Sequence, residues 1–181
     1  MTTLPWGRAL TCADLEAVPD DGHRYELIDG TLIVSPAPRP LHQRVVGKVF
    51  RLLDDACPDD TYEVFVAPLD VILADDTLLQ PDVLVARTAD LTDRNLPAAP
   101  ALAVEVLSDS TRGIDLLLKR ERLQRAGCPA YWVIDPDKPS LTAMELRGGT
   151  YHDLAVVTGR ETFTTAVPYA IALSPLDLVS R

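Results

Sequence analysis

Two apolar segments, each interrupted by a single carboxylate, constrain the fold of this chain more than any other feature. They are residues 80–85, which contain Asp82, and residues 102–108, which contain Glu105. Each run is typical of a buried strand, where a charge is unfavourable unless it is paired or binds a metal ion. If the two strands adjoin, their alternation lets both carboxylates point into one cleft. Carboxylate oxygens are the ligands that Mg²⁺ prefers, so we expect a divalent-cation site and, with it, phosphodiester chemistry.

The bulk composition indicates one domain, over residues 1–181, with a substantial core. The chain has 181 residues, of which 47% are hydrophobic, and this is enough to bury a core. No apolar run approaches about 18 residues, so we expect no membrane-spanning helix. The first residues lack the layout of a secretory signal. Cys12, Cys57 and Cys128 are odd in number and far apart, which indicates reduced thiols in a cytoplasmic protein.

The charge balance argues against nucleic-acid affinity over the whole surface. The net charge is −10 and the pI is about 4.6, which disfavours non-specific binding to phosphates. Many basic residues nevertheless fall on two expected helices: Arg39, Arg44, Lys48 and Arg51 on or near the first, and Arg112, Lys119, Arg120, Arg122 and Arg125 on the second. A DNA track is one interpretation, but solvated helix faces are the more frequent explanation of such charges.

Local patterns predict an α/β fold, with a mixed central sheet flanked by helices and an N-terminal β-hairpin. In the hairpin, strands at 24–28 and 31–34 flank Asp29-Gly30, a strong two-residue turn signal. Helices are expected at 11–16, at 41–54, and from the capping residues 108–111 to about Ala126. Further strands are expected at 62–66, 69–73, 79–86, 101–107, 130–134, 141–146, 151–157 and 162–166.

Lys119 is the third candidate for the site. On a helical wheel it shares a face with Asp115, Leu123 and Ala126, so we expect its side chain to point inward. An inward lysine could orient the attacking water or bind the scissile phosphate. The structural alternative is an ion pair between Asp115 and Lys119, four residues apart on the helix.

Two further residues are weaker candidates. Glu26 lies on the hairpin, with Arg24 and Ile28 on its face, and could be an acidic ligand or an ordinary exposed carboxylate. His42 falls within the apolar arc of its helix, where a histidine is more often a core residue than a catalyst. The chain contains no nucleophile elbow, P-loop or dinucleotide fingerprint.

The ordered set of motifs resembles the Uma family of restriction-endonuclease-like proteins, within the PD-(D/E)XK nuclease superfamily. The matching pieces are residues 24–30, 35–38 followed by His42, 80–83, 104–108, Ser110-Thr111, Asp115 with Lys119, and 131–136. The resemblance implies a restriction-endonuclease-like fold. It implies that Asp82 and Glu105 hold the metal, that Glu26 is the upstream acidic residue, and that Lys119 supplies the lysine from the helix.

The chain departs from the superfamily pattern at three positions. Leu107 stands where a lysine usually follows the second acid by two residues, although migration of that lysine to the helix is characteristic of the Uma family. Ala130 replaces an acidic residue that often precedes the Tyr-Trp pair, and Leu123 replaces a tyrosine one turn after the lysine.

By this resemblance we expect a Mg²⁺-dependent endonuclease, with Mn²⁺ as a substitute metal, DNA as substrate and a homodimeric assembly suited to cutting both strands. Two alternatives stay open. One is a catalytically inactive nuclease fold that binds nucleic acid or a protein partner, and the other is an interaction domain whose carboxylates are structural.

Overall fold

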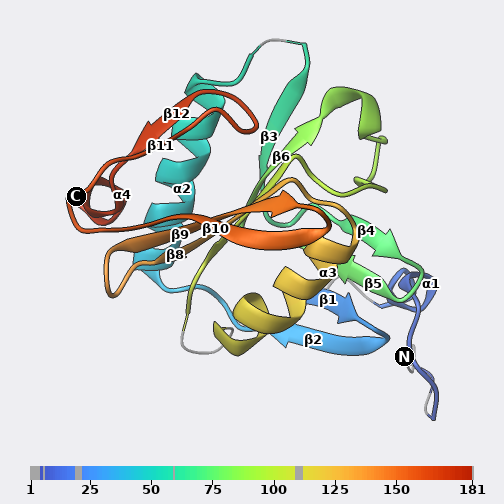
Figure 1. Cartoon of the computed structure of the whole chain (residues 1–181). Coiled ribbons are helices and arrows are strands. Elements are labelled where there is room, and N and C mark those ends of the chain that lie inside the picture. Colours follow the sequence, from blue (N-terminus) through green and yellow to red (C-terminus); the bar gives the residue numbers. More distant parts are fainter. Residues whose placement is uncertain (1–4, 6, 19–21, 59, 109–111, 181) are drawn as a thin grey trace.

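The predicted α/β fold with a mixed central sheet is confirmed. The structure, a computed structural model, describes residues 5, 7–18, 22–58, 60–108 and 112–180, apart from the Asp115 side chain. Within this part of the chain, the central sheet has the spatial order β10 (Thr150–Thr158), β9 (Ser140–Arg147), β8 (Ala130–Asp135), β7 (Leu102–Val106), β6 (Val83–Arg87) and β3 (Tyr62–Val66). Strands β7 and β8 are parallel and the other neighbours are antiparallel (Figure 1).

The predicted N-terminal hairpin is confirmed as part of a second, smaller sheet. Its order is β2 (Thr31–Ser35), β1 (Arg24–Ile28), β5 (Thr77–Leu79) and β4 (Val71–Ala74). Asp29 and Gly30 join β1 to β2 with φ angles of 49° and 73°. Positive φ at both central residues defines the type I′ turn, which an Asp-Gly pair favours.

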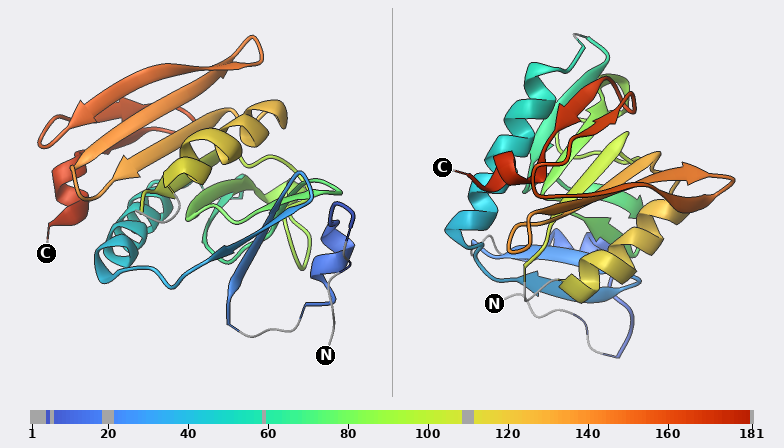
Figure 2. Two further views of the ribbon diagram at one scale, coloured as in Figure 1. Left: turned by 90° about the horizontal axis from the view of Figure 1, so that it is seen from below. Right: turned by 60° about the vertical axis from the view of Figure 1, so that its left-hand side comes forward.

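Helices cover both faces of the central sheet (Figure 2). The helix α2 (Pro40–Asp55) presents Val45, Val49 and Leu53 to one face, where they pack in one core cluster with Val104 and Trp132. The other face is covered by η2 (Ile114–Lys119), a π-helix, and by α3 (Arg120–Arg125), which follows it. Because side chains alternate along a strand, each buried strand contributes side chains to the core layers on both faces of the sheet.

The predicted strand at 79–86 is wrong as a single element. β5 ends at Leu79 and β6 begins at Val83, so the intervening Gln80, Pro81 and Asp82 cross from the smaller sheet to the central one. Pro81 has no N–H to give to a ladder, which explains the break. The crossing leaves Asp82 directly before β6.

The remaining elements are short: α1 (Cys12–Leu15), η1 (Thr88–Asp90), β11 (Phe163–Thr165), β12 (Ile171–Leu173) and α4 (Pro175–Val179). β11 pairs with β12, and the Lys48 ammonium donates hydrogen bonds to the carbonyls of Asp177 and Ser180, each at 2.6 Å. Lys48 therefore connects the C-terminal helix to α2, a contact that neither a DNA track nor a solvated helix face anticipates.

Two predictions concern residues whose structure lies outside the described part of the chain. They are the helix-capping role of residues 109–111 and the ion pair of the Asp115 side chain with Lys119. Within the described residues, no helix is long and apolar enough to cross a membrane.

Candidate active site

The strands β6 and β7 adjoin, which is the condition for Asp82 and Glu105 to share one cleft. β6 and β7 pair with Val83 opposite Val104 and Leu84 opposite Ala103. One further step along this register brings Asp82 to the position opposite Glu105, and residues directly opposite in an antiparallel pair share a face. The Val106 N–H donates a hydrogen bond to Asp82 Oδ2 at 2.9 Å. Only 5% of Asp82 and 1% of Glu105 are exposed.

Lys119 points inward, as the helical wheel predicted, and it lies between two carboxylates. Its Nζ donates to Glu105 Oε1 at 3.1 Å and lies 2.9 Å from Glu26 Oε1. The residue is 2% exposed. It is the last residue of the π-helix η2, and π-helical turns are found frequently at functional sites.

Glu26 belongs to this buried cluster, so its interpretation as an exposed hairpin carboxylate is wrong. Glu26 is 1% exposed, and its Oε1 accepts a hydrogen bond from the Gln80 backbone N–H at 2.7 Å. The contact joins β1 to the crossing segment that carries Asp82. Glu26 therefore connects the smaller sheet to the carboxylates of the central sheet.

His42 also reaches the cluster. It lies one turn before the stripe of Val45 and Val49 on α2, and its Nε2 is 3.1 Å from Asp82 Oδ2. Among the described residues, its buried Nδ1 has no hydrogen-bond partner. The ring therefore contacts a carboxylate rather than only the apolar core, and its catalytic role stays a prediction.

Arg24 is a member of the cluster that the sequence reasoning did not select. Its Nη1 donates to Asp82 Oδ1 at 2.9 Å, and its Nη2 lies 3.6 Å from Glu26 Oε1. The available signal was the alternation along β1, which places Arg24 and Glu26 on one face. We use the name acidic cluster for Arg24, Glu26, His42, Asp82, Glu105 and Lys119.

Within the acidic cluster, neighbouring groups of opposite charge stabilise the ionised forms of Asp82 and Arg24. Burial opposes ionisation of Asp82, but the hydrogen bond with His42 and the positive charge of Arg24 outweigh it and lower the pKa of Asp82 below its ordinary value. Burial likewise opposes the charge of Arg24, whereas Glu26 and Asp82 raise its pKa above the ordinary value. Asp82 is therefore an anion at neutral pH although it is buried.

Comparison with known proteins identifies the family of this chain. The family model described as "Uma2: Putative restriction endonuclease" matches residues 12–175. The chain belongs to the Uma2 family. It is 32% identical over 120 residues to the uncharacterized protein sll1609 of Synechocystis sp. (strain ATCC 27184 / PCC 6803 / Kazusa), a match that covers 64% of this chain and 68% of that protein.

A solved structure shares the fold of this Uma2 family member. It is a crystal structure of a putative nuclease belonging to DUF820 from Anabaena variabilis ATCC 29413, at 18% sequence identity. The TM-score is 0.77, and the match covers 94% of this chain and 97% of that one. At this level of identity the similarity concerns the fold.

In this Uma2 family chain the acidic cluster offers a metal two carboxylates. Among the described residues, no three or more His, Cys, Asp or Glu side chains form a group that could hold a metal ion. Mg²⁺, however, is often bound by one or two carboxylates, with waters and substrate oxygens completing its shell. Hard oxygen donors from Asp82 and Glu105, one of them ionised despite burial, fit that mode.

The three departures from the motif pattern lie in the apolar core. Leu107 is 4% exposed and packs in one cluster with Leu123, which is fully buried, and Ala130 is 3% exposed in β8. Leucine side chains at these positions fill space in the layer between the central sheet and α3. No cation approaches Glu105 from residue 107, so Lys119 supplies this contact.

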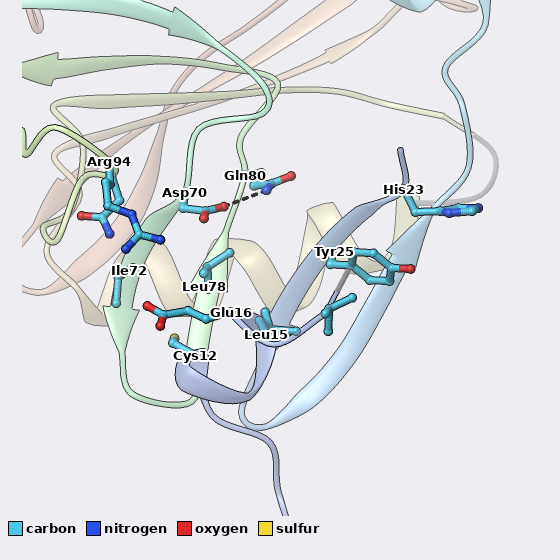
Figure 3. A pocket seen from close by; sticks show the side chains of 12 residues that line it. Cys12, Leu15, Glu16, His23, Tyr25, Asp70, Ile72, Leu78, Gln80 and Arg94 are labelled. Carbon is cyan, nitrogen blue, oxygen red and sulfur yellow. Dashed lines mark hydrogen bonds between the residues drawn. The ribbon is translucent and has the colours of Figure 1, made fainter. Parts of the chain in front are cut away.

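A cavity of about 350 Å³ lies elsewhere, along the smaller sheet (Figure 3). Tyr25, Ile72, Leu78 and Gln80 are among the described residues that line it, whereas the members of the acidic cluster are not. Tyr25 precedes Glu26 on β1, and neighbouring side chains of a strand point to opposite faces. The cavity and the acidic cluster are therefore on different sides of β1.

The basic residues on the two helices are mostly engaged in ion pairs. The pairs are Arg39–Asp137, Arg51–Asp55, Arg112–Asp135, Arg122–Asp29 and Arg125–Glu121. This favours the interpretation of these charges as solvated, paired faces rather than as a continuous DNA track.

Proposed function

We propose that this protein is a metal-dependent endonuclease that hydrolyses phosphodiester bonds of DNA. The observation that carries the proposal is the convergence of Asp82, Glu105 and Lys119, from three separate segments, in one buried cluster. Membership of the Uma2 restriction-endonuclease family supports the reaction class. Asp82 and Glu105 would hold the Mg²⁺ or Mn²⁺ ion.

The side chains around these carboxylates would have distinct tasks. A bound Mg²⁺ supplies activation of water and stabilisation of charge on the phosphate. Lys119, which contacts Glu105, would orient the water or the scissile phosphate. Glu26 would hold Lys119 in place, and His42 would fix the orientation of Asp82.

The proposal includes a homodimer in the cytoplasm. Two copies related by a two-fold axis would present two sites to the two strands of DNA. The free thiols of Cys12, Cys57 and Cys128 support a reducing compartment. Sedimentation at micromolar concentration should give the mass of a dimer, and a monomer under all conditions would contradict this part of the proposal.

The central test compares DNA cleavage by the wild-type protein and by Glu105→Gln. With Mg²⁺ or Mn²⁺ the wild-type protein should nick or linearise plasmid DNA, and EDTA should abolish cleavage. Glu105→Gln should reduce the rate by at least about 100-fold, because the proposed metal ion loses a negatively charged ligand and is held less well. The control is Glu145→Gln, which changes a β9 carboxylate paired with Arg147 outside the acidic cluster. Circular dichroism checks that both variants fold.

The second candidate is a nuclease fold without catalytic activity that binds nucleic acid or a protein. The observation that favours it is that protein cations already contact both carboxylates, Arg24 at Asp82 and Lys119 at Glu105. In that case plasmid and single-stranded DNA would stay intact across Mg²⁺ and Mn²⁺ concentrations. Asp82→Ala would then leave the binding of DNA unchanged.

A further inference from the structure

Each carboxylate that would hold the metal has a positively charged neighbour supplied by the protein. Arg24 donates to Asp82 Oδ1 at 2.9 Å, and Lys119 donates to Glu105 Oε1 at 3.1 Å. A divalent cation on Asp82 would stand within a few ångströms of the guanidinium. Like charges at that distance repel strongly in a buried site.

The third carboxylate offers these protein cations another partner. Glu26 Oε1 lies 2.9 Å from Lys119 Nζ and 3.6 Å from Arg24 Nη2. Lys119 can therefore keep an ion pair with Glu26 when Glu105 turns to a metal. Arg24 needs only a small movement to exchange its contact with Asp82 for a closer one with Glu26.

The guanidinium of Arg24 also has spare hydrogen-bonding capacity. Its Nε and Nη2 are buried and, within the described part of the chain, have no hydrogen-bond partner. An arginine presents its donors as a planar fork that matches two oxygens of a phosphate. With 23% of its side chain exposed, Arg24 is the more accessible of the two cations, since Lys119 is 3% exposed.

We propose that Arg24 is an internal cation that exchanges with the divalent metal at Asp82, and that its released guanidinium binds the phosphate of the substrate. This inference rests on the proposed metal site at Asp82 and Glu105. Without phosphate, Arg24 stays on Asp82 and weakens metal binding. With phosphate, Arg24 has a new anionic partner and the metal takes its place. Metal and phosphate then strengthen each other's binding, because coupling between two sites is reciprocal.

The experiment measures Mn²⁺ affinity by titration calorimetry, independently of cleavage. Arg24→Met should bind Mn²⁺ at least about tenfold more tightly than the wild-type protein, because a competing positive charge is removed. Arg24→Gln, which retains polarity without charge, should change in the same direction and serves if Arg24→Met does not fold. The control is Arg39→Met, whose pair with Asp137 is exposed, and it should bind as the wild-type protein does.

Thymidine 5′-monophosphate tests the second half of the inference. It should raise the Mn²⁺ affinity of the wild-type protein at least about fivefold, which is within the usual range of coupling between sites. It should leave the affinity of Arg24→Met almost unchanged. An equal effect in both proteins would show that the phosphate binds the metal or another residue, and would overturn this half.

The role of Glu26 is separated from that of a direct ligand by a double-mutant cycle. Glu26→Gln should weaken Mn²⁺ binding in the wild-type background, because both Arg24 and Lys119 lose an alternative partner. Beside Arg24→Met it should weaken Mn²⁺ binding less, because only the contact with Lys119 is then lost. A direct ligand would lower the affinity equally in both backgrounds.

Failure of the proposed cation exchange and failure of the proposed metal site give different results. If wild-type Mn²⁺ binding depends on Glu105 but Arg24→Met binds no more tightly, the exchange is wrong and the proposed metal site stands. If Glu105→Gln does not affect Mn²⁺ binding in any background, both are overturned.

Discussion

At the scale of single residues, Lys119 is a buried charge that is stable only with its carboxylate partners. Its ammonium is buried between the carboxylates of Glu26 and Glu105. Removing one partner of a buried ion pair leaves an uncompensated charge, which is far more unfavourable than the pair itself. Lys119 is therefore needed for stability as well as for the chemistry proposed for it.

We predict that Lys119→Met lowers the free energy of unfolding by about 3–5 kcal/mol, since two buried carboxylates then lack their shared cation. Urea denaturation measures the change. The matched control is Lys138→Met at an exposed position, which should change it by less than about 0.5 kcal/mol. A loss as small as that of the control would mean that Glu26 and Glu105 do not depend on the lysine charge.

The sequence located most members of the acidic cluster because each breaks an apolar pattern. Asp82 and Glu105 interrupt buried strands, and Lys119 falls on the apolar side of a helical wheel. Arg24 could not be found in this way, because alternation shows that it shares a face with Glu26 without showing that the face is buried. Its contact with Asp82 joins residues 58 positions apart, and only the folded chain reveals it.

At the scale of elements, the turn between β1 and β2 needs a glycine at position 30 for two reasons: a positive φ and the lack of space for a side chain. Gly30 has a φ of +73°, and a Cβ added there would lie 2.5 Å from the Ala9 Cβ and 3.0 Å from the Ala9 Cα. The backbone of Ala9 and Leu10 lies against Gly30, so an added methyl group would fit only if that backbone moved. Gly149, in the turn between β9 and β10, has a φ of +81° and open space around it.

We predict that Gly149→Ala destabilises the protein by about 1 kcal/mol, the penalty of a left-handed conformation alone. Gly30→Ala should lower stability by at least about 1 kcal/mol more, because overpacking adds to that penalty. Thermal and urea unfolding of the two variants measure the difference. Equal losses would show that the N-terminal segment yields to the added methyl group without resistance.

Periodicity predicted the long elements well and the irregular ones poorly. The helix expected at 41–54 is α2, because its apolar stripe is regular. The split of β5 from β6 and the π-helix η2 were not predicted, since both depend on how the two sheets meet. β12 and α4 were not predicted either. α4 is held against α2 by the hydrogen bonds of the Lys48 ammonium. Tyr169, which lies just before β12, donates its hydroxyl to the Leu53 carbonyl of α2 at 2.8 Å.

At the scale of the whole molecule, the buried carboxylates make stability depend on pH. The pKa of Asp82 is lowered, as is that of Asp135, where burial opposes ionisation but the contacts with Arg112 and with the backbone N–H groups of Lys138 and Asp137 together outweigh it. A carboxylate with a lowered pKa contributes stability above its unfolded pKa, about 3.9. That stability is lost as the pH falls through the folded pKa, because the unfolded chain binds the proton first.

We predict that the free energy of unfolding falls steadily as the pH is lowered from 5 toward 2, and that Asp82→Asn makes this decline shallower. The variant is less stable at neutral pH, so the slope rather than the absolute value is the readout. Urea titrations at several pH values measure it, with Asp153→Asn at an exposed position of β10 as control. Parallel curves for Asp82→Asn and wild-type protein would contradict a lowered pKa at Asp82.

The acidic cluster is assembled from β1, α2, the segment directly before β6, β7 and η2, so it extends over residues 24 to 119 of the chain. Undocking the N-terminal hairpin would withdraw Arg24 and Glu26 together, while Asp82 and Glu105 would stay paired through the ladder of β6 and β7. Asp82 and Glu105 would then remain as neighbouring anions on the central sheet, and Asp82 would lack its contact with Arg24. Such a pair would draw a cation from solution more readily, so opening of the hairpin and uptake of an ion would favour each other.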